Sequence, residues 1–200
     1  MKILGITGGV GSGKSRVLDE LKKEYGAYIV EADKLAHELM KPGKNIYNQI
    51  KKCFGDEILT NEAPYEIDRA KLGQIVFSNN DKLKLLNSII HPMVKKNIIE
   101  DIEEKKKKGD IKLYVIEAAL LAQDGYDRIC DEIWYVWASR KERTKRLMDG
   151  RGYSKEKCDS MINSQADDSY YKEHSNYVIN NDSDYETTSK QLKARLNIFI

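Results

Sequence analysis

Several kinds of residue are scarce in this 200-residue sequence, and each scarcity excludes a class of protein. Only 3 prolines, beside 40% hydrophobic residues, argue against a disordered or low-complexity chain. The 34 lysines and arginines barely exceed the 32 aspartates and glutamates, so no general excess of positive charge favours nucleic-acid binding. The longest apolar runs, such as residues 134–138, are far too short to span a membrane.

Cysteine is equally scarce. Cys53, Cys130 and Cys158 are scattered and form no CxxC pair, which favours reduced cytoplasmic thiols over a disulfide framework or a zinc site. The sequence enters a glycine-rich turn directly after residues 1–7, so we expect no signal peptide. We therefore expect one cytoplasmic globular unit, a monomer or weak homo-oligomer, with neither nucleic acid nor membrane as a partner.

What the sequence does contain is an alternation of short apolar strands and helical periodicity. Strands are predicted at 2–7, 27–31, 112–117, 132–138 and 176–180. Helical crossovers between them favour an α/β fold with a parallel, doubly wound five-stranded sheet flanked by helices. Two long helical and polar stretches between strands are expected to be insertions on the ligand side of the sheet.

Local chemistry predicts where several helices begin and end. The residue before proline is pushed out of helical geometry, so His91-Pro92 is expected to separate a run of short helices from a long helix. Residues 139–142 and 183–186 both read as capping boxes, in which Ser139 and Ser183 would satisfy the first amides of new helices.

Residues 8–15, Gly-Gly-Val-Gly-Ser-Gly-Lys-Ser, match the phosphate-binding P-loop pattern GxxxxGK[ST]. Glycine permits positive φ, so successive amides can turn toward a phosphate, and the following helix adds the positive end of its dipole. The alternative is a glycine-rich turn with a chance match, but the apolar strand before it and the amphipathic helix after it favour a nucleotide-phosphate site with Mg²⁺. The residues expected to bind the nucleotide are Gly9, Gly11, Ser12, Gly13, Lys14 and Ser15, with the Ser15 hydroxyl also on the metal.

Two carboxylates stand at the ends of predicted strands, and each has two interpretations. Asp33 follows the second strand, where it could accept the proton of an attacking hydroxyl or could cap the helix that starts at Lys34. Glu117 ends the third strand, where it could hold Mg²⁺ through water or simply terminate the strand. Position alone leaves both alternatives open.

Together these motifs resemble those of the dephospho-CoA kinase family over nearly the whole chain. Beyond the P-loop, the matching segments are 29–33, Pro42-Gly43, Asp68-Arg69 with Leu72 and 76–77, His91-Pro92, 117–121, 146–148, 152–154, Gln165 and 178–181. The resemblance implies a kinase of three parts: a core at about 1–33, 92–139 and 173–200, an acceptor-binding insertion at about 34–91, and a mobile lid at about 140–172.

The resemblance further implies that ATP phosphorylates the ribose 3′-hydroxyl of dephospho-CoA, giving coenzyme A and ADP. Asp33 would be the catalytic base and Lys14 would act on the transferred phosphoryl group. Arg69 and His91 would lie on the acceptor side, although a surface ion pair and a helix corner are the respective alternatives. The arginines expected near ATP are Arg16, Arg143, Arg146 and Arg151, of which Arg146 coincides with the lid arginine of the family.

The chain departs from the family pattern at a few positions: Arg16 stands for the commoner Thr, Ala119 for Pro, Gln123 for Glu, Asn180 for Asp, and the arginine before Asp-Gly is displaced to Arg151. We expect an active enzyme with local rewiring. The rival interpretations are a nucleoside-monophosphate or small-metabolite kinase on the same core, and a non-catalytic ATP-binding regulator.

Overall fold

The computed structural model describes residues 1–200, and internal contacts divide the chain into two units. The first unit combines residues 1–30 with 106–200, and the second comprises residues 31–105. The second unit thus extends beyond residue 91, the limit expected for the insertion, because the long helix there continues. No helix is both long and apolar enough to cross a membrane.

A five-stranded sheet forms the centre of the first unit, in the order β2-β3-β1-β4-β5. All five predicted strands are confirmed to within one residue at each end. The pairs β1–β3, β1–β4 and β4–β5 are parallel, as expected for strands joined by helical crossovers. The strands are β1 Lys2–Thr7, β2 Tyr28–Glu31, β3 Leu113–Glu117, β4 Glu132–Trp137 and β5 Tyr177–Asn180.

Apolar side chains on β1, β3 and β4 explain why these strands form the interior. Leu4, Val115 and Trp134 are fully buried in one cluster with the inward residues of two helices, among them Leu21 and Leu192. A strand buried on both faces reads as a nearly continuous apolar run, and β1 has that pattern from Ile3 onward. Trp134 is therefore a core residue.

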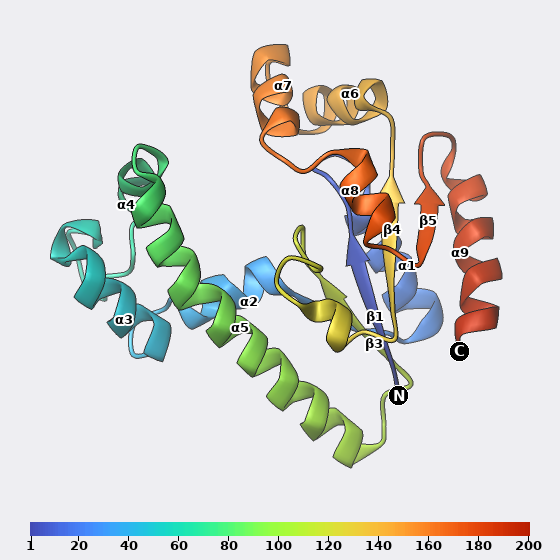
Figure 1. Cartoon of the computed structure of the whole chain (residues 1–200), viewed down its shortest axis with the longest axis horizontal. Coiled ribbons are helices and arrows are strands. Elements are labelled where there is room, and N and C mark those ends of the chain that lie inside the picture. Colours follow the sequence, from blue (N-terminus) through green and yellow to red (C-terminus); the bar gives the residue numbers. More distant parts are fainter. The chain divides into compact units, whose positions relative to one another are not determined.

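The helices of the first unit cover the sheet and extend beyond its carboxyl ends. Figure 1 shows α6 and α7 beyond the tips of the β1 and β4 arrows, and α9 beside β5. The P-loop, residues 8–13, lies between β1 and the start of α1. The bounds are α1 Lys14–Tyr25, α6 Arg140–Arg151, α7 Lys155–Asn163, α8 Asp168–Glu173 and α9 Tyr185–Phe199, with a short 3-10 helix at Tyr126–Arg128.

The second unit is helical and has an apolar core of its own. Ile46 and Ile50 of α3 are buried together with Ile58, Leu72 of α4 and Ile89 of α5. Because these residues bury one another, the unit has the packing expected of a separately stabilised insertion. Its helices are α2 Ala32–Leu39, α3 Asn45–Phe54, the short 3-10 helix Asp56–Ile58, α4 Arg69–Phe77 and α5 Asn80–Lys108.

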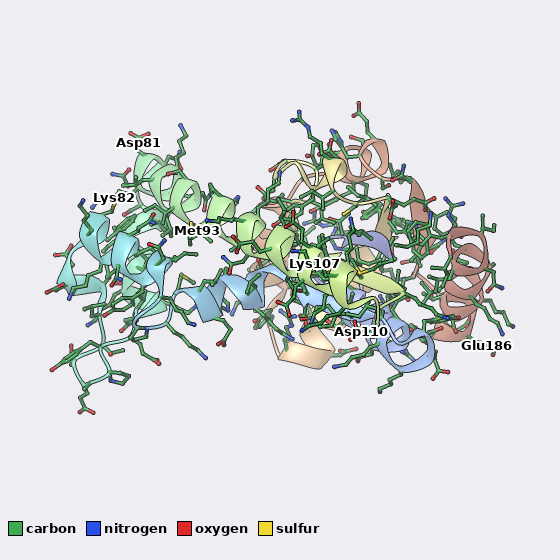
Figure 2. The ribbon with its side chains drawn as sticks, turned by 90° about the horizontal axis from the view of Figure 1, so that it is seen from below. Asp81, Lys82, Met93, Lys107, Asp110 and Glu186 are labelled. Atoms are coloured by element: carbon green, nitrogen blue, oxygen red, sulfur yellow. The ribbon has the colours of Figure 1, made fainter.

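The expected helix break at His91-Pro92 is wrong, because α5 continues through Pro92. Figure 2 labels Asp81 and Lys82 at the beginning of this helix, Met93 just after the proline, and Lys107 near the end. An interior proline costs a helix about 3 kcal/mol. Ile89, before the proline, is buried in the core of the second unit, and Met93, after it, packs against the same core. Full burial of one such side chain is worth about 1.5–3 kcal/mol, so Ile89 together with the partly buried Met93 offsets much of that cost.

The two predicted capping boxes have different outcomes. Ser139 is the N-cap of α6 and its hydroxyl accepts a 3.3 Å hydrogen bond from the Glu142 amide, which confirms the Ser139 half of the box. The other half is wrong, because the Ser139 amide donates to Asp182 and not to Glu142. For the last helix, the predicted cap Ser183 is wrong by one residue. Asp184 is the N-cap of α9, and its carboxylate accepts a 2.9 Å hydrogen bond from the Thr187 amide. A carboxylate also interacts favourably with the helix dipole, so it is the stronger cap of the two.

Candidate active site

The P-loop has the backbone conformation that its glycines permit. Gly11 and Gly13 have φ of 77° and 94°, values that other residues rarely adopt. Gly13 is also the N-cap of α1, and the first backbone hydrogen bonds of that helix are donated by Arg16 and Val17 to the Gly13 carbonyl. The amides that precede Arg16 therefore lie at the helix N-terminus without an intrahelical acceptor, where backbone N–H groups and the helix dipole favour an anion.

Side chains distant in the sequence donate hydrogen bonds to two carbonyls of the P-loop. The Val10 carbonyl accepts a 2.8 Å hydrogen bond from Nε of Arg143. The Ser12 carbonyl accepts two, from Nδ2 of Asn181 at 2.7 Å and from Nη1 of Arg146 at 3.1 Å. These hydrogen bonds fix the loop backbone, and since the Val10 and Ser12 amides have acceptors of their own, the other amides of the loop are those available to an anion.

The same residues leave no room for side chains on two loop glycines. A Cβ atom on Gly9 would collide with the guanidinium of Arg143, and a Cβ atom on Gly13 would collide with the side-chain amide of Asn181. Gly13 is thus required both for its backbone conformation and for this close packing, whereas a side chain at Gly9 would displace the guanidinium of Arg143.

Lys14 and Glu117 lie together beside the loop. Nζ of Lys14 donates a 2.7 Å hydrogen bond to the Gly8 carbonyl and lies 3.5 Å from Oε1 of Glu117. Ser15 follows in the first turn of α1. A hydroxyl and a carboxylate are the oxygen ligands that Mg²⁺ prefers, and Mg²⁺ in kinases takes its remaining ligands from water and phosphate. These residues therefore fit a nucleotide with its magnesium ion.

The four arginines predicted near ATP occupy different surroundings. Arg146 is bound to the loop and also donates to the Asn181 carbonyl at 2.8 Å and to Glu142 at 3.0 Å. Arg143 is buried, with only 5% of its surface exposed. Arg16 stacks on the ring of Tyr185, whereas Arg151 is exposed at the end of α6. Tertiary contacts thus hold Arg143 and Arg146, and not Arg151, against the loop.

Gln165, in the segment between α7 and α8, binds the loop in a way that the sequence did not predict. Its Oε1 accepts hydrogen bonds from the Val10 amide and from Nη2 of Arg143, each at 2.8 Å. The sequence likewise predicted no individual role for Asn181, because it is matched only within segment 178–181, which resembles the family. A single amide side chain in a connecting segment carries no periodic or motif signal, so only the fold identifies these contacts.

The last part of the predicted lid is anchored to the sheet through Asp168 of α8. Its carboxylate accepts hydrogen bonds from the Tyr135 hydroxyl at 2.7 Å and from Nε1 of Trp137 at 2.6 Å, both on β4. Tyr135 also stacks on Tyr171, with ring centres 4.9 Å apart. Burial raises the pKa of both tyrosines, so their hydroxyls are neutral at physiological pH.

Asp182 joins the two corners that follow β4 and β5. Its carboxylate accepts a 2.7 Å hydrogen bond from the Ser139 amide. Hydrogen bonding to the Ser139 side chain and to that amide holds the pKa of Asp182 below its ordinary value. The contact fixes the start of α6, and hence Arg143 and Arg146, relative to the end of β5.

In the second unit, Asp33 lies in the first turn of α2. The interpretation of Asp33 as the N-cap is wrong, because Glu31 occupies that position and the helix begins at Ala32. Tyr28–Glu31 leads directly into the helix without an intervening loop, so the helix starts earlier than expected. A carboxylate in the first helical turn is stabilised by the helix dipole.

Arg69 begins α4, whose N-cap Asp68 accepts hydrogen bonds from the amides of Ala70 and Lys71. The carboxylate of Asp68 thus caps the helix, and Arg69 instead lines a pocket of about 120 Å³. His91 lies within α5 and not at a corner between helices. The other residues that line the pocket are His37, Met40, Lys41, Glu66 and Ile67.

Comparisons with solved structures agree with this architecture. A crystal structure of a Thermus thermophilus protein is 27% identical and has a TM-score of 0.82, covering 100% of this chain and 98% of that one. Dephospho-CoA kinase from Campylobacter jejuni, 24% identical, covers the same shares with a TM-score of 0.70. A shikimate kinase from Bacteroides thetaiotaomicron, 11% identical over 98% of this chain and 97% of its own, shares the fold with a TM-score of 0.54.

Sequence comparisons identify the family. The family model described as dephospho-CoA kinase matches residues 2–187. A dephospho-CoA kinase from Carboxydothermus hydrogenoformans is 38% identical over 192 residues, 96% of this chain and 91% of the relative. Another, from Dehalococcoides mccartyi, is 38% identical over 186 residues, 93% of this chain and 91% of the relative. With the P-loop and the sheet that carries it, these matches establish that the chain belongs to the dephospho-CoA kinase family.

Proposed function

We propose that this protein transfers the γ-phosphoryl group of ATP to the ribose 3′-hydroxyl of dephospho-CoA, the final step of coenzyme A synthesis. The observation that carries the proposal is the family match over residues 2–187, in a chain that keeps a complete P-loop whose Val10 and Ser12 carbonyls are held by Arg143 and Asn181. In the reaction the 3′-oxygen forms a bond to the γ-phosphorus, the bond between that phosphorus and the β,γ-bridging oxygen breaks, and ADP leaves.

On the nucleotide side, the loop amides and Lys14 bind the phosphate oxygens and stabilise the charge that develops on them. The Ser15 hydroxyl would hold Mg²⁺, and Glu117 would hold it through water. The metal, when bound, neutralises charge on the β- and γ-phosphates. Because Nζ of Lys14 lies 3.5 Å from Oε1 of Glu117, the carboxylate keeps the ammonium near the loop.

Arg146 supplies a fixed positive charge in the wall of the nucleotide site, and Arg151 and Arg16 lie nearer the solvent. A guanidinium held by several hydrogen bonds is already oriented and loses little entropy when a phosphate binds. Arg146 meets this condition, because it donates to two backbone carbonyls and to Glu142.

On the acceptor side, Asp33 orients the 3′-hydroxyl and takes its proton. An aspartate with this role contributes through position and proton acceptance, as in other phosphoryl transfers. Arg69 binds an anionic part of dephospho-CoA, since its guanidinium lines the pocket of the second unit together with Lys41 and His37. His91 contributes to the same side from α5.

Acceptor choice tests the proposal most directly. ADP release is measured with ATP, Mg²⁺ and each of dephospho-CoA, AMP, CMP and shikimate, against a reaction without acceptor. We expect acceptor-dependent ADP release with dephospho-CoA alone. Release with another acceptor and none with dephospho-CoA would identify a different small-molecule kinase, and nucleotide binding without turnover on any acceptor would identify a regulator.

A further inference from the structure

Val10, the central residue of the P-loop, is held on three sides by the segment predicted to be a lid. Its carbonyl accepts from Arg143 of α6 and its amide donates to Gln165 after α7. Its side chain packs against a small apolar cluster of Leu147, Cys158 and Ile162, which joins α6 to α7. The α6–α7 segment and the loop are therefore one packed body at this point.

Arg143 brings an unneutralised positive charge into that body. The residue is only 5% exposed, yet the hydrogen-bond partners of its guanidinium, the Val10 carbonyl and the Gln165 side chain, are both uncharged. No carboxylate forms an ion pair with it, and the carboxylate of Asp168, also in the predicted lid, is bound by Tyr135 and Trp137. A buried charge without a counter-ion is costly, so its presence beside a phosphate loop requires an explanation.

On the basis of the proposed function, we propose that Arg143 and Gln165 are positioning residues that set the affinity of this enzyme for the triphosphate. Arg143 acts through Val10 and through its electrostatic field, and needs no contact with the nucleotide. Gln165 has the complementary role, because a neutral acceptor fixes the guanidinium and the Val10 amide without cancelling the positive charge. The negative counter-charge is then supplied by the phosphates of ATP.

If Arg143 and Gln165 have these roles, a negative charge at residue 165 should weaken ATP binding. Gln165→Glu keeps the oxygen that accepts from Val10 and Arg143 and nearly the same shape, but it adds a carboxylate that pairs with Arg143. If the two residues served only to hold the fold, a charge-assisted bond would hold it better and nucleotide binding would be unchanged. If the uncompensated charge matters, the variant is as stable as the parent and binds ATP more weakly.

The test measures the dissociation constant for ATP by titration calorimetry, without acceptor, so that it does not depend on which acceptor the enzyme uses. For Gln165→Glu we expect the dissociation constant to rise on the order of tenfold, with an unchanged or higher melting temperature. The matched control is Asn163→Asp, because exposed Asn163 also accepts from an arginine, Arg140 at 2.8 Å. That variant adds the same charge two residues away and should bind ATP as the parent does.

Steady-state kinetics adds a second measurement: in Gln165→Glu the KM for ATP rises while the KM for the acceptor stays constant. Arg143→Gln should weaken ATP binding as well, and if it fails to fold, the Gln165 variant still decides the matter. Unchanged ATP affinity in Gln165→Glu, or equal weakening in Asn163→Asp, would overturn the proposal. A failure of the proposed function would look different, since ATP would bind but dephospho-CoA would not be phosphorylated.

Discussion

The side-chain amide of Asn181 donates a 2.7 Å hydrogen bond to the main-chain carbonyl of Ser12, 169 residues earlier in the chain. The same side chain accepts a 2.9 Å hydrogen bond from the hydroxyl of Thr188, which is fully buried. The corner after β5 and the first turns of α9 are thereby connected to the phosphate loop by hydrogen bonds. The shape of the nucleotide site thus depends on parts of the chain outside the P-loop motif.

Replacement of Asn181 by alanine should destabilise the fold and weaken nucleotide binding. The buried hydroxyl of Thr188 loses its best acceptor, so we expect a loss of about 1–3 kcal/mol in the free energy of unfolding, measured by urea denaturation. The KM for ATP should rise as well. The control is Asn180→Ala, because exposed Asn180 uses its side chain only to accept from the Asp182 amide at 3.0 Å. Equal effects of the two substitutions would contradict this role.

Two glycine-to-alanine substitutions should have opposite effects. Gly13→Ala places a methyl group against Asn181 at a φ of 94°, and we expect a loss of more than about 1 kcal/mol together with impaired ATP binding. Gly150 lies inside α6 with nothing near its Cβ position, so Gly150→Ala should stabilise the protein by about 0.5–1 kcal/mol. Thermal denaturation of both variants measures the difference. Stabilisation by Gly13→Ala would contradict the close packing between Gly13 and Asn181.

Asp33→Asn should strongly reduce turnover and leave nucleotide binding intact. The amide cannot take the proton of the 3′-hydroxyl, so we expect kcat to fall by about 100-fold to 10,000-fold, measured as ADP release. ATP affinity should stay within a factor of about two, since Asp33 does not bind the nucleotide phosphates. As a control, Asp81→Asn changes a carboxylate whose side chain is 95% exposed in α5 and should be silent. Retained turnover in Asp33→Asn would remove Asp33 as the base.

Arg69→Ala should affect the acceptor and not ATP. Loss of a charge-assisted hydrogen bond is worth about 1.5–3 kcal/mol, so the KM for dephospho-CoA should rise by about tenfold or more. Lys84→Ala removes a positive charge from the same unit, where the side chain is 81% exposed, and should leave both KM values unchanged. A rise in the KM for ATP alone would place Arg69 on the nucleotide side.

Of the three cysteines, Cys53 should react first with an alkylating agent. Burial, reinforced by nearby Asp131 and Asp127, raises the pKa of Cys130 to about 12, so almost no thiolate forms there. Cys158 is buried and Cys53 is exposed. With iodoacetamide at about pH 8, mass spectrometry of the folded protein should find Cys53 modified first. Early modification of Cys130 would contradict its burial.

The sequence predicted the fold well because its signals are local. Each strand is an apolar run bounded by polar residues or glycine, and all five were located to within one residue. Two local rules failed where another interaction was stronger. Pro92 did not end its helix because buried residues on both sides hold it, and Ser183 did not cap α9 because Asp184 is the better acceptor.

The P-loop could likewise be read from the sequence, since its phosphate-binding residues are consecutive and their chemistry follows from glycine conformation and a helix N-terminus. The hydrogen bonds that hold that loop in position could not be predicted from the sequence. Arg143, Gln165 and Asn181 contact it from 133 to 169 residues away, and their pattern in the sequence is that of ordinary polar residues. A hydrogen bond depends on distance in space, and only the parallel order of the strands places β1, β4 and β5 side by side. The local sequence determined which residues can bind phosphate, and the tertiary structure decided which residues hold them in position.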